Sequence, residues 1–166
     1  MTAPPLPTLW MRLPVGGWQV GFWIDGRGRT HTDVADPLDT LVYRGASARP
    51  TVPSIDAGWT GWGSGPGGET RCWALAIGHV PVGLGHSVSF VSAAGLSPVG
   101  QDQGALLPDG WTGLRVTEDG LWVATAAGAP AHVRLTAYSH VRLTAPGVAL
   151  QYPLLPISHD RPDRAR

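Results

Sequence analysis

Two tryptophans in a glycine-rich stretch are the residues of this chain best suited to binding a ligand. Trp59 and Trp62 stand in DAGWTGWGSGPGG, residues 56–68, where the glycines predict a loop that gives the rings little local cover. A rigid amphipathic ring on a loop can stack on a sugar or fill a pocket of a partner protein. Asp56 and Glu69 are near enough in the sequence to bond the hydroxyl groups of a carbohydrate. The alternative that both rings fold back over the end of the β-structure is favoured over exposure.

Motifs of catalytic or cofactor-binding sites are incomplete. GSGPGG, residues 63–68, has the glycine spacing of a dinucleotide-binding loop, but a strand pattern follows it where that site needs the start of a helix. GHSVS, residues 85–89, lacks the last glycine of a serine-hydrolase elbow, and no helix follows. We therefore expect no catalytic residue and no cofactor. An enzyme is the third hypothesis, because the loops of a β-fold can assemble a site from distant segments.

The histidines and the cysteine predict no metal site. Six histidines form neither an H-x-H nor an H-E-x-x-H pattern, and Cys72 is the only cysteine. The word HVRLTA occurs twice in residues 132–145, which repeats a histidine after eight residues. On one strand His132 and His140 would be about 26 Å apart, too far to share a metal ion.

Composition limits the partners of the chain. Of its 166 residues 43% are hydrophobic and 14% charged, and 12 basic residues, all arginine, balance 12 acidic ones. No uniform positive field is available for nucleic acid, so that partner is not expected. The amino terminus does not read as a signal peptide and no apolar run is long enough to span a membrane. We therefore expect a cytoplasmic protein or one incorporated into a virion-like particle.

Short alternating segments separated by turn signals predict an all-β fold. We expect a single antiparallel β-sandwich or barrel, of the jelly-roll or immunoglobulin-like kind, with about seven to nine strands. One hairpin is predicted in residues 18–34, with its turn at Asp25 and with Trp18, Val20, Phe22 and Ile24 on one face. A second is predicted in residues 114–125, with Val116 opposite Val123 and Leu114 opposite Thr125.

Four further segments have predicted structures. Residues 70–78 and 86–95 read as inner strands that are neighbours, and DPLDTLVY reads as one helical turn capped by Asp36. Residues 132–145 alternate without a break, which favours one long strand bent near Ser139 over a hairpin at that point. Its inward residues would be Val133, Leu135, Ala137, Val141, Leu143 and Ala145.

Both ends of the chain read as extended arms around a β-domain of residues 15–145. Residues 1–14 and 146–166 are rich in proline, yet they carry apolar side chains that need cover: Trp10, Tyr152, Leu154, Leu155 and Ile157. The first hypothesis is therefore a non-enzymatic structural or interaction module, a subunit of a larger assembly such as a phage-like virion or tail, with protein partners. The second is a carbohydrate-binding module that uses the two loop tryptophans.

Overall fold

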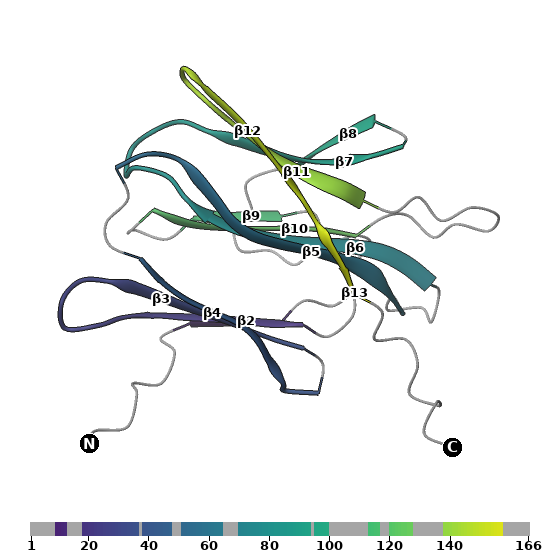
Figure 1. Ribbon diagram of the computed structural model, residues 1–166, viewed down its shortest axis with the longest axis horizontal. Helices are drawn as coiled ribbons and strands as arrows, with labels where there is room; N and C mark the ends of the chain where they lie inside the picture. Colours follow the sequence, from purple (N-terminus) through teal and green to yellow (C-terminus); the bar gives the residue numbers. More distant parts are fainter. Residues whose placement is uncertain are drawn as a thin grey trace.

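Every regular element of the structure is a β-strand. The computed structural model describes residues 9–12, 18–36, 38–47, 51–64, 70–93, 95–99, 113–116, 120–127 and 138–157. These residues form thirteen strands (Figure 1) and no helix that could cross a membrane. The all-β prediction is confirmed, but the expected count of seven to nine strands is too low.

The strands form three sheets. Neighbouring strands pair antiparallel, except for one parallel pair at the edge of one sheet. Sheet A has the order β1-β2-β3-β4 and consists of β1 (Leu9–Arg12), β2 (Gln19–Ile24), β3 (Thr30–Ala35) and β4 (Leu41–Ser47). Sheet B has the order β13-β5-β6-β10-β9, with β13 parallel to β5, and consists of β5 (Ser54–Ser64), β6 (Thr70–His79), β9 (Gly113–Val116), β10 (Leu121–Ala127) and β13 (Leu155–Ile157). Sheet C has the order β12-β11-β7-β8 and consists of β7 (Ser87–Ser92), β8 (Gly95–Val99), β11 (Tyr138–Ala145) and β12 (Val148–Pro153).

Sheet B is the middle one of three layers (Figure 1). Alternate residues of β6 enter two different apolar clusters, because successive side chains of a strand point to opposite faces. Trp73, Leu75 and Ile77 pack against sheet A, whereas Cys72, Ala74 and Ala76 pack against sheet C. Burial on both faces explains why CWALAIG, residues 72–78, is an unbroken apolar run. The described strands thus form three stacked sheets with free edge strands, and none of these sheets closes into a barrel.

The two apolar clusters differ in their side chains. Between sheets A and B, the ring of Trp18 lies 6.4 Å from that of Trp59 and 5.2 Å from that of Trp73. Between sheets B and C, four alanines of the middle sheet, Ala74, Ala76, Ala124 and Ala126, lie in one cluster with the ring of Trp122 and with Phe90 and Tyr138 of sheet C. Aromatic rings therefore contribute to both interfaces, and the alanines leave room for larger side chains at one of them.

The β2–β3 hairpin confirms the first predicted turn. The Asp25 carboxylate accepts hydrogen bonds from the backbone N–H groups of Arg27 and Arg29 at 2.8 and 3.0 Å. Its other oxygen lies 2.8 Å from Nε2 of His31, whose ring stacks on Trp23. Ile24 is 51% exposed, although Trp18 and Val20, predicted for the same face, are buried. It is the last residue of β2, beside the turn.

The β9–β10 hairpin confirms the second predicted pair of strands but not its register. Val116 pairs with Trp122, and Leu114 pairs with Ala124, one residue away from the expected partners. The prediction assumed a two-residue turn at Asp119 and Gly120. The observed register differs by one position from the register that this turn would set, so every partner moves by one residue.

Two local predictions need correction. β6 and β7 are not neighbours in a sheet: β6 pairs with β5 and β10, whereas β7 pairs with β8 and β11. Their side chains meet face to face instead, in the cluster between sheets B and C. In the segment that begins at Asp36, the described residues contain no helix. The Asp36 carboxylate accepts hydrogen bonds from the N–H groups of Leu38 and Thr40, and its carbonyl oxygen accepts one from the N–H of Asp39, which has a φ of 62°, so a tight turn connects β3 to β4.

Only the second half of the repeated word lies within the described residues. Residues 138–145 form the single strand β11, so a hairpin at Ser139 is wrong, and Val141, Leu143 and Ala145 are buried as predicted. The register with β7 shifts between Tyr138 and His140, at the expected bend. This bulge turns Tyr138 inward, whereas strict alternation placed it outside. Residues 132–137 lie outside the described part of the chain.

The expected arms are partly strands. Residues 9–12 form β1, where Trp10 pairs with Gly21, and the remaining residues of 1–14 lie outside the described part. Residues 148–157 of the expected C-terminal arm are extended and paired, as β12 and β13, so this part of the arm lies against the sheets of the chain itself. The prolines of β12 and β13 are tolerated because both strands lie at sheet edges, where a missing N–H leaves no ladder bond broken.

Candidate ligand-binding site

A cleft of about 410 Å³ opens between sheets A and B. It lies at the end of the stack where β3 and β5 begin and where β4 and β6 end. Eight residues line it: Thr30, Thr32, Tyr43, Gly45, Ala46, Ile55, Asp56 and His79. The volume suits a small ligand, since such pockets usually measure about 300 to 1,000 Å³.

Asp56 enters the cleft because the strand that carries it is irregular. The register of β5 with β6 shifts between Ile55 and Ala57, which makes Asp56 the extra residue of a β-bulge. Its carboxylate accepts a hydrogen bond from the Ser54 hydroxyl at 2.8 Å. The other carboxylate oxygen lies 2.5 Å from Nδ1 of His79, the last residue of β6. The bulge thus turns the Asp56 side chain into the cleft, where Ser54 and His79 hold its carboxylate in place.

The Asp56 contact orients the His79 ring. A carboxylate only accepts hydrogen bonds, so in a hydrogen bond between an Asp56 carboxylate and Nδ1 of His79 the Nδ1–H group is the donor. His79 is buried, whereas Asp56 keeps about a quarter of its side chain exposed, at 25%. The carboxylate can therefore meet both the imidazole and a ligand.

Tyr43 forms the opposite wall of the cleft. Its ring packs edge-on against Trp59, with centroids 5.6 Å apart. Burial, and then the negative charge of Asp56, raises the pKa of the Tyr43 hydroxyl, which stays protonated. A Cβ atom at Gly45 would lie 2.4 Å from this hydroxyl. Gly45 therefore leaves the space into which the phenol extends.

The described side chains of the cleft can form hydrogen bonds with a ligand. The Ser54 hydroxyl donates its hydrogen bond to the Asp56 carboxylate, which also contacts His79. Within the residues that the structure describes, no group of three or more His, Cys, Asp or Glu side chains could hold a metal ion. What the cleft offers is a carboxylate, an imidazole, a phenol and the two hydroxyls of Thr30 and Thr32.

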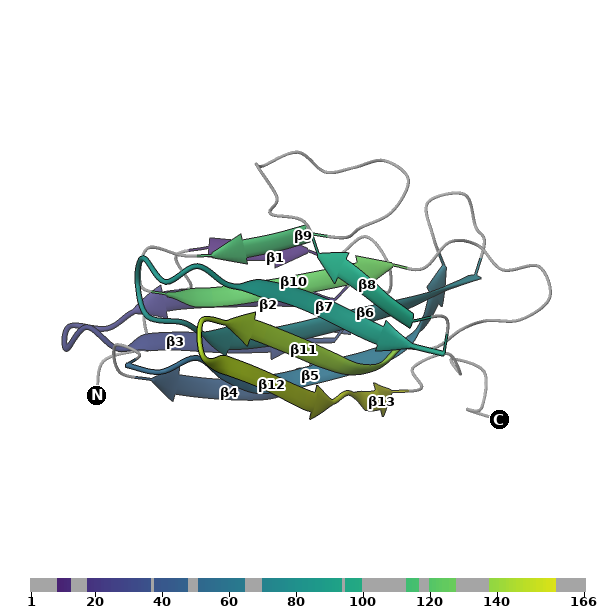
Figure 2. The ribbon, with the colours of Figure 1, turned by 90° about the horizontal axis from the view of Figure 1, so that it is seen from above.

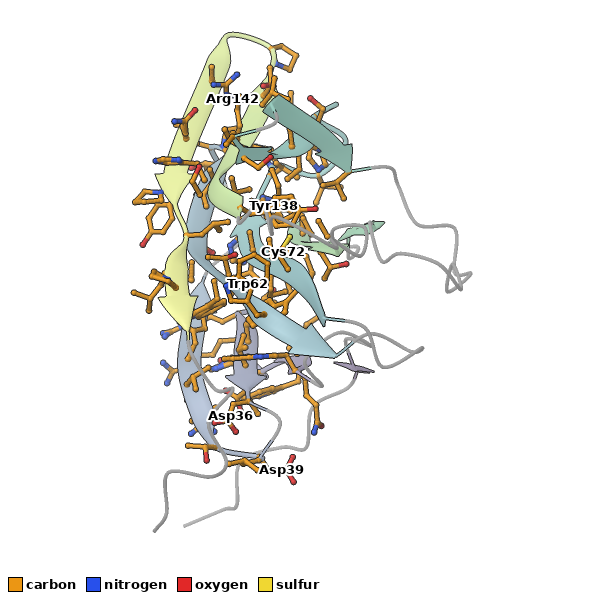
Figure 3. The ribbon with its side chains drawn as sticks, turned by 90° about the vertical axis from the view of Figure 1, so that its right-hand side faces the viewer. Asp36, Asp39, Trp62, Cys72, Tyr138 and Arg142 are labelled. Carbon is orange, nitrogen blue, oxygen red and sulfur yellow. The ribbon has the colours of Figure 1, made fainter. Side chains whose placement is uncertain are left out.

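The two tryptophans do not form one exposed platform. Both lie on strand β5, so the predicted loop is wrong for residues 54–64, and Glu69 lies outside the described residues. Trp59 is 4% exposed and faces sheet A. Trp62 faces sheet C, where it packs partly buried beside Cys72 and Tyr138 (Figure 3). The strand tolerates Gly58 because Leu154 fills the space of the missing side chain.

Of the residues predicted to bind a ligand, only Asp56 lines the cleft. The sequence analysis missed Thr30, Thr32, Tyr43 and His79. One signal was available for the threonines: THTDV places both of them on the same face as the buried Val34, where a polar pair is unusual. For Tyr43 and His79 the signal was absent, because pairing between distant strands brings them to Asp56.

The apolar residues of the expected arms lie in three different environments. Leu154 is 5% exposed, within the cluster between sheets B and C. Tyr152 and Leu155 are 39% and 59% exposed, on the edge strands β12 and β13. The backbones of Trp10 and Ile157 pair in β1 and β13, and their side chains lie outside the described part of the structure.

Comparison with known proteins identifies no related protein. The chain matches no protein family, no curated protein and no solved structure. Its function must therefore be inferred from the geometry of the cleft and of the sheet edges.

Proposed function

We propose that this chain is a non-enzymatic binding module whose cleft between sheets A and B holds a small neutral ligand rich in hydroxyl groups, such as a sugar unit. The observation that carries the proposal is the bulged Asp56, held by Ser54 and His79 with part of its carboxylate open to the cleft. A carboxylate has about four acceptor sites, and two are used here, so two remain for ligand hydroxyls.

The charge and shape of the cleft favour a neutral ligand. Its lining residues include one carboxylate and no arginine, which disfavours phosphate and carboxylate ligands. The threonine hydroxyls both donate and accept hydrogen bonds, as sugar hydroxyls do. The Tyr43 ring adds an apolar wall against which the C–H face of a sugar can pack.

Saturation-transfer NMR and calorimetry of the full chain with a panel of neutral mono- and disaccharides test this proposal. Asp56→Asn keeps the shape of the side chain and removes its charge. It should weaken binding by about 10- to 100-fold, because a hydrogen bond to a charged group contributes about 1.5–3 kcal/mol. Gly45→Ala should also weaken binding, because the added methyl group displaces the Tyr43 hydroxyl.

Each variant has a matched control. Asp25→Asn changes the other Asp–His pair, which lies in the β2–β3 turn and does not line the cleft, and Gly85→Ala adds a methyl group where no atom lies within 4 Å. Both controls should bind as the unchanged chain does. The proposal fails if no sugar in the panel binds, or if Asp56→Asn and Gly45→Ala bind the same sugar with unaltered affinity while remaining folded.

A second candidate is a structural subunit of a larger protein assembly, such as a virion-like particle. It is favoured by Tyr152 and Leu155, two exposed apolar residues on the edge strands of sheets C and B. In this proposal sheets B and C act as the expected sandwich and sheet A covers one face. Light scattering on the native protein should give a mass far above 17.5 kDa, and Tyr152→Ser with Leu155→Ser should reduce it. A monomer at all concentrations would remove this candidate.

A further inference from the structure

The outer face of sheet C carries the second copy of the repeated word. The inward side chains of β11 are buried against sheet B, so His140, Arg142 and Thr144, which alternate with them, point away from it. Sheet C is the outermost layer on its side of the stack (Figure 1). Figure 2 looks onto this face, where β12, β11, β7 and β8 lie side by side. None of the described elements covers it.

The charges of the described residues are separated between the sheets. The four strands of sheet C contain neither Asp nor Glu. The carboxylates that the structure describes all belong to sheets A and B or to their turns: Asp25, Asp33, Asp36, Asp39 and Asp56. In Figure 3, Arg142 lies near one end of the stack, and Asp36 and Asp39 lie near the opposite end. An anionic ligand therefore meets no repelling carboxylate among the described residues of sheet C.

Arg142 is held in position without being neutralised. Its Nε and Nη2 atoms donate to Oε1 of Gln151 at 3.2 and 2.8 Å. Arg44 of sheet A uses the same two nitrogens on the carboxylate of Asp33, at 2.9 Å each. The carboxylate of Asp33 compensates the charge of Arg44, whereas the amide of Gln151 is neutral. The N–H groups of Nη1 and the second one of Nη2 have no partner among the described residues, and together they form a fork that matches a carboxylate.

His140 offers a second contact beside Arg142. The Ser139 hydroxyl donates to the carbonyl oxygen of Val91 at 3.2 Å, so in its hydrogen bond of 2.9 Å with His140 the Nδ1–H group is the donor. This bond orients the ring, and in a neutral ring it leaves Nε2 as an acceptor for a ligand hydroxyl. His140 and Arg142 are two residues apart on one strand face, which separates them by about 7 Å. One sugar unit can reach both.

The neighbouring strands add a polar row and an apolar row. Ser89 of β7 pairs with Arg142, and Ser87 pairs with Thr144, so three hydroxyl side chains surround the guanidinium on this face. The residues in the row through His140 are apolar and keep part of their surface exposed: Pro153, Val91 and Leu96. A sugar ring has hydroxyl groups at its rim and C–H groups on its face, so the two rows together are complementary to it.

We propose that the outer face of sheet C binds a carboxylated polysaccharide, with a carboxylate on the free fork of Arg142 and hydroxyl groups on His140 and Ser89. The uncompensated arginine selects an acidic ligand, and the hydroxyl and apolar rows select a sugar over an acidic peptide. A single exposed ion pair is weak, but a polymer presents the same group repeatedly, which strengthens its binding. This site is separate from the cleft and does not rest on the function proposed for it.

Affinity electrophoresis and calorimetry of the full chain with polygalacturonate, alginate and hyaluronate test this proposal. At least one of them should bind, whereas neutral dextran and polyglutamate should bind about tenfold more weakly or not at all. Arg142→Gln removes the charge. Gln151→Glu places a carboxylate on the nitrogens of Arg142, as Asp33 does for Arg44. Each substitution should weaken binding by about tenfold or more, because a charged hydrogen bond is lost.

Arg27→Gln is the matched control. It changes the net charge by the same amount as the two other variants, but in the exposed β2–β3 turn of sheet A, and it should bind the polysaccharide as the unchanged chain does. Arg142→Gln should still bind neutral sugars in the cleft, so failure of one site is distinguishable from failure of the other. The proposal is overturned if none of the three polysaccharides binds or if polyglutamate binds equally well. It is also overturned if Arg27→Gln weakens binding as much as Arg142→Gln, or if Arg142→Gln and Gln151→Glu remain folded and keep full affinity.

Discussion

A methyl group at position 78 should destabilise the protein far more than its size suggests. Gly78 lies near the end of β6, between Ile55 of β5 and Trp122 of β10. A Cβ atom there would stand 2.1 Å from the carbonyl oxygen of Ser54 and 2.4 Å from a ring carbon of Trp122. Both distances are far below van der Waals contact, so the start of β5 or the indole ring must move.

Neither Ser54 nor Trp122 can move without a loss of packing or of a hydrogen bond. Trp122 is fully buried, and its indole N–H donates to the same Ser54 carbonyl oxygen at 3.2 Å. Overpacking of a core costs about 1–3 kcal/mol, and loss of the hydrogen bond adds about 1 kcal/mol. The free energy of unfolding of Gly78→Ala should therefore fall by about 2–4 kcal/mol. In a chain of this length that lowers Tm by about 4–16 °C.

Urea unfolding followed by tryptophan fluorescence measures the change, with Gly85→Ala as the control because its methyl group meets no atom within 4 Å. The control should unfold within about 0.5 kcal/mol of the unchanged chain. The reasoning would be refuted if the free energy of unfolding of Gly78→Ala also lay within about 0.5 kcal/mol of that of the unchanged chain. Ser54 and Trp122 would then separate freely, and the start of β5 would not be fixed well enough to hold Asp56 in the cleft.

Three further predictions concern pH and one turn. The His31 side chain and two backbone N–H groups lower the pKa of Asp25 from 3.8 to about 2. The contribution of the Asp25 carboxylate to stability is therefore present above pH 4 and should be lost as the pH falls toward 2. Urea unfolding of Asp25→Asn over this range should lack that pH dependence. Burial raises the pKa of Tyr138 from 10.0 to about 12, so stability should decrease between these pH values as the unfolded phenol ionises, and Tyr138→Phe should remove the slope. Gly147 has a φ of 73° with open space around it, so Gly147→Ala should cost about 1–2 kcal/mol of unfolding free energy through backbone strain alone, while sugar binding is unchanged.

Local patterns predicted the elements whose signal is contained in a few neighbouring residues. The Asp25 turn, the inward row of β11 and the bend at Ser139 each follow from alternation and turn chemistry. β6 was also recognisable as an inner strand. Its partners were not, because a run that is apolar on both faces carries no information about which strand lies beside it.

Glycine and proline misled the sequence analysis where tertiary contacts decide the outcome. Gly58 suggested a loop, yet it lies within β5 because Leu154 occupies the space of its side chain. Pro153 and Pro156 suggested an extended arm beyond the β-domain, yet both lie in edge strands that need no N–H at those positions. In each case the compensating residue is distant in the sequence or depends on the place of the strand in its sheet.

The candidate site was the least predictable part. Asp56 was singled out for its nearness to the tryptophans, which in fact lie on strand β5 and serve two packing interfaces. Its real partner is His79, 23 residues away, and the opposite wall comes from Tyr43 of sheet A. A cleft between two sheets depends on how the sheets stack, and no pattern within one strand records that.

The double burial of β6 has a consequence for the dynamics of the whole chain. Its backbone amides are bonded to β5 and β10, and its side chains are covered by sheets A and C. Deuterium should therefore enter β6 only when the protein opens globally, whereas the amides of β4 and β12 exchange through local fraying at their edges. Neither outer sheet is a removable appendage, since loss of either one would leave a hydrophobic surface of β6 in water.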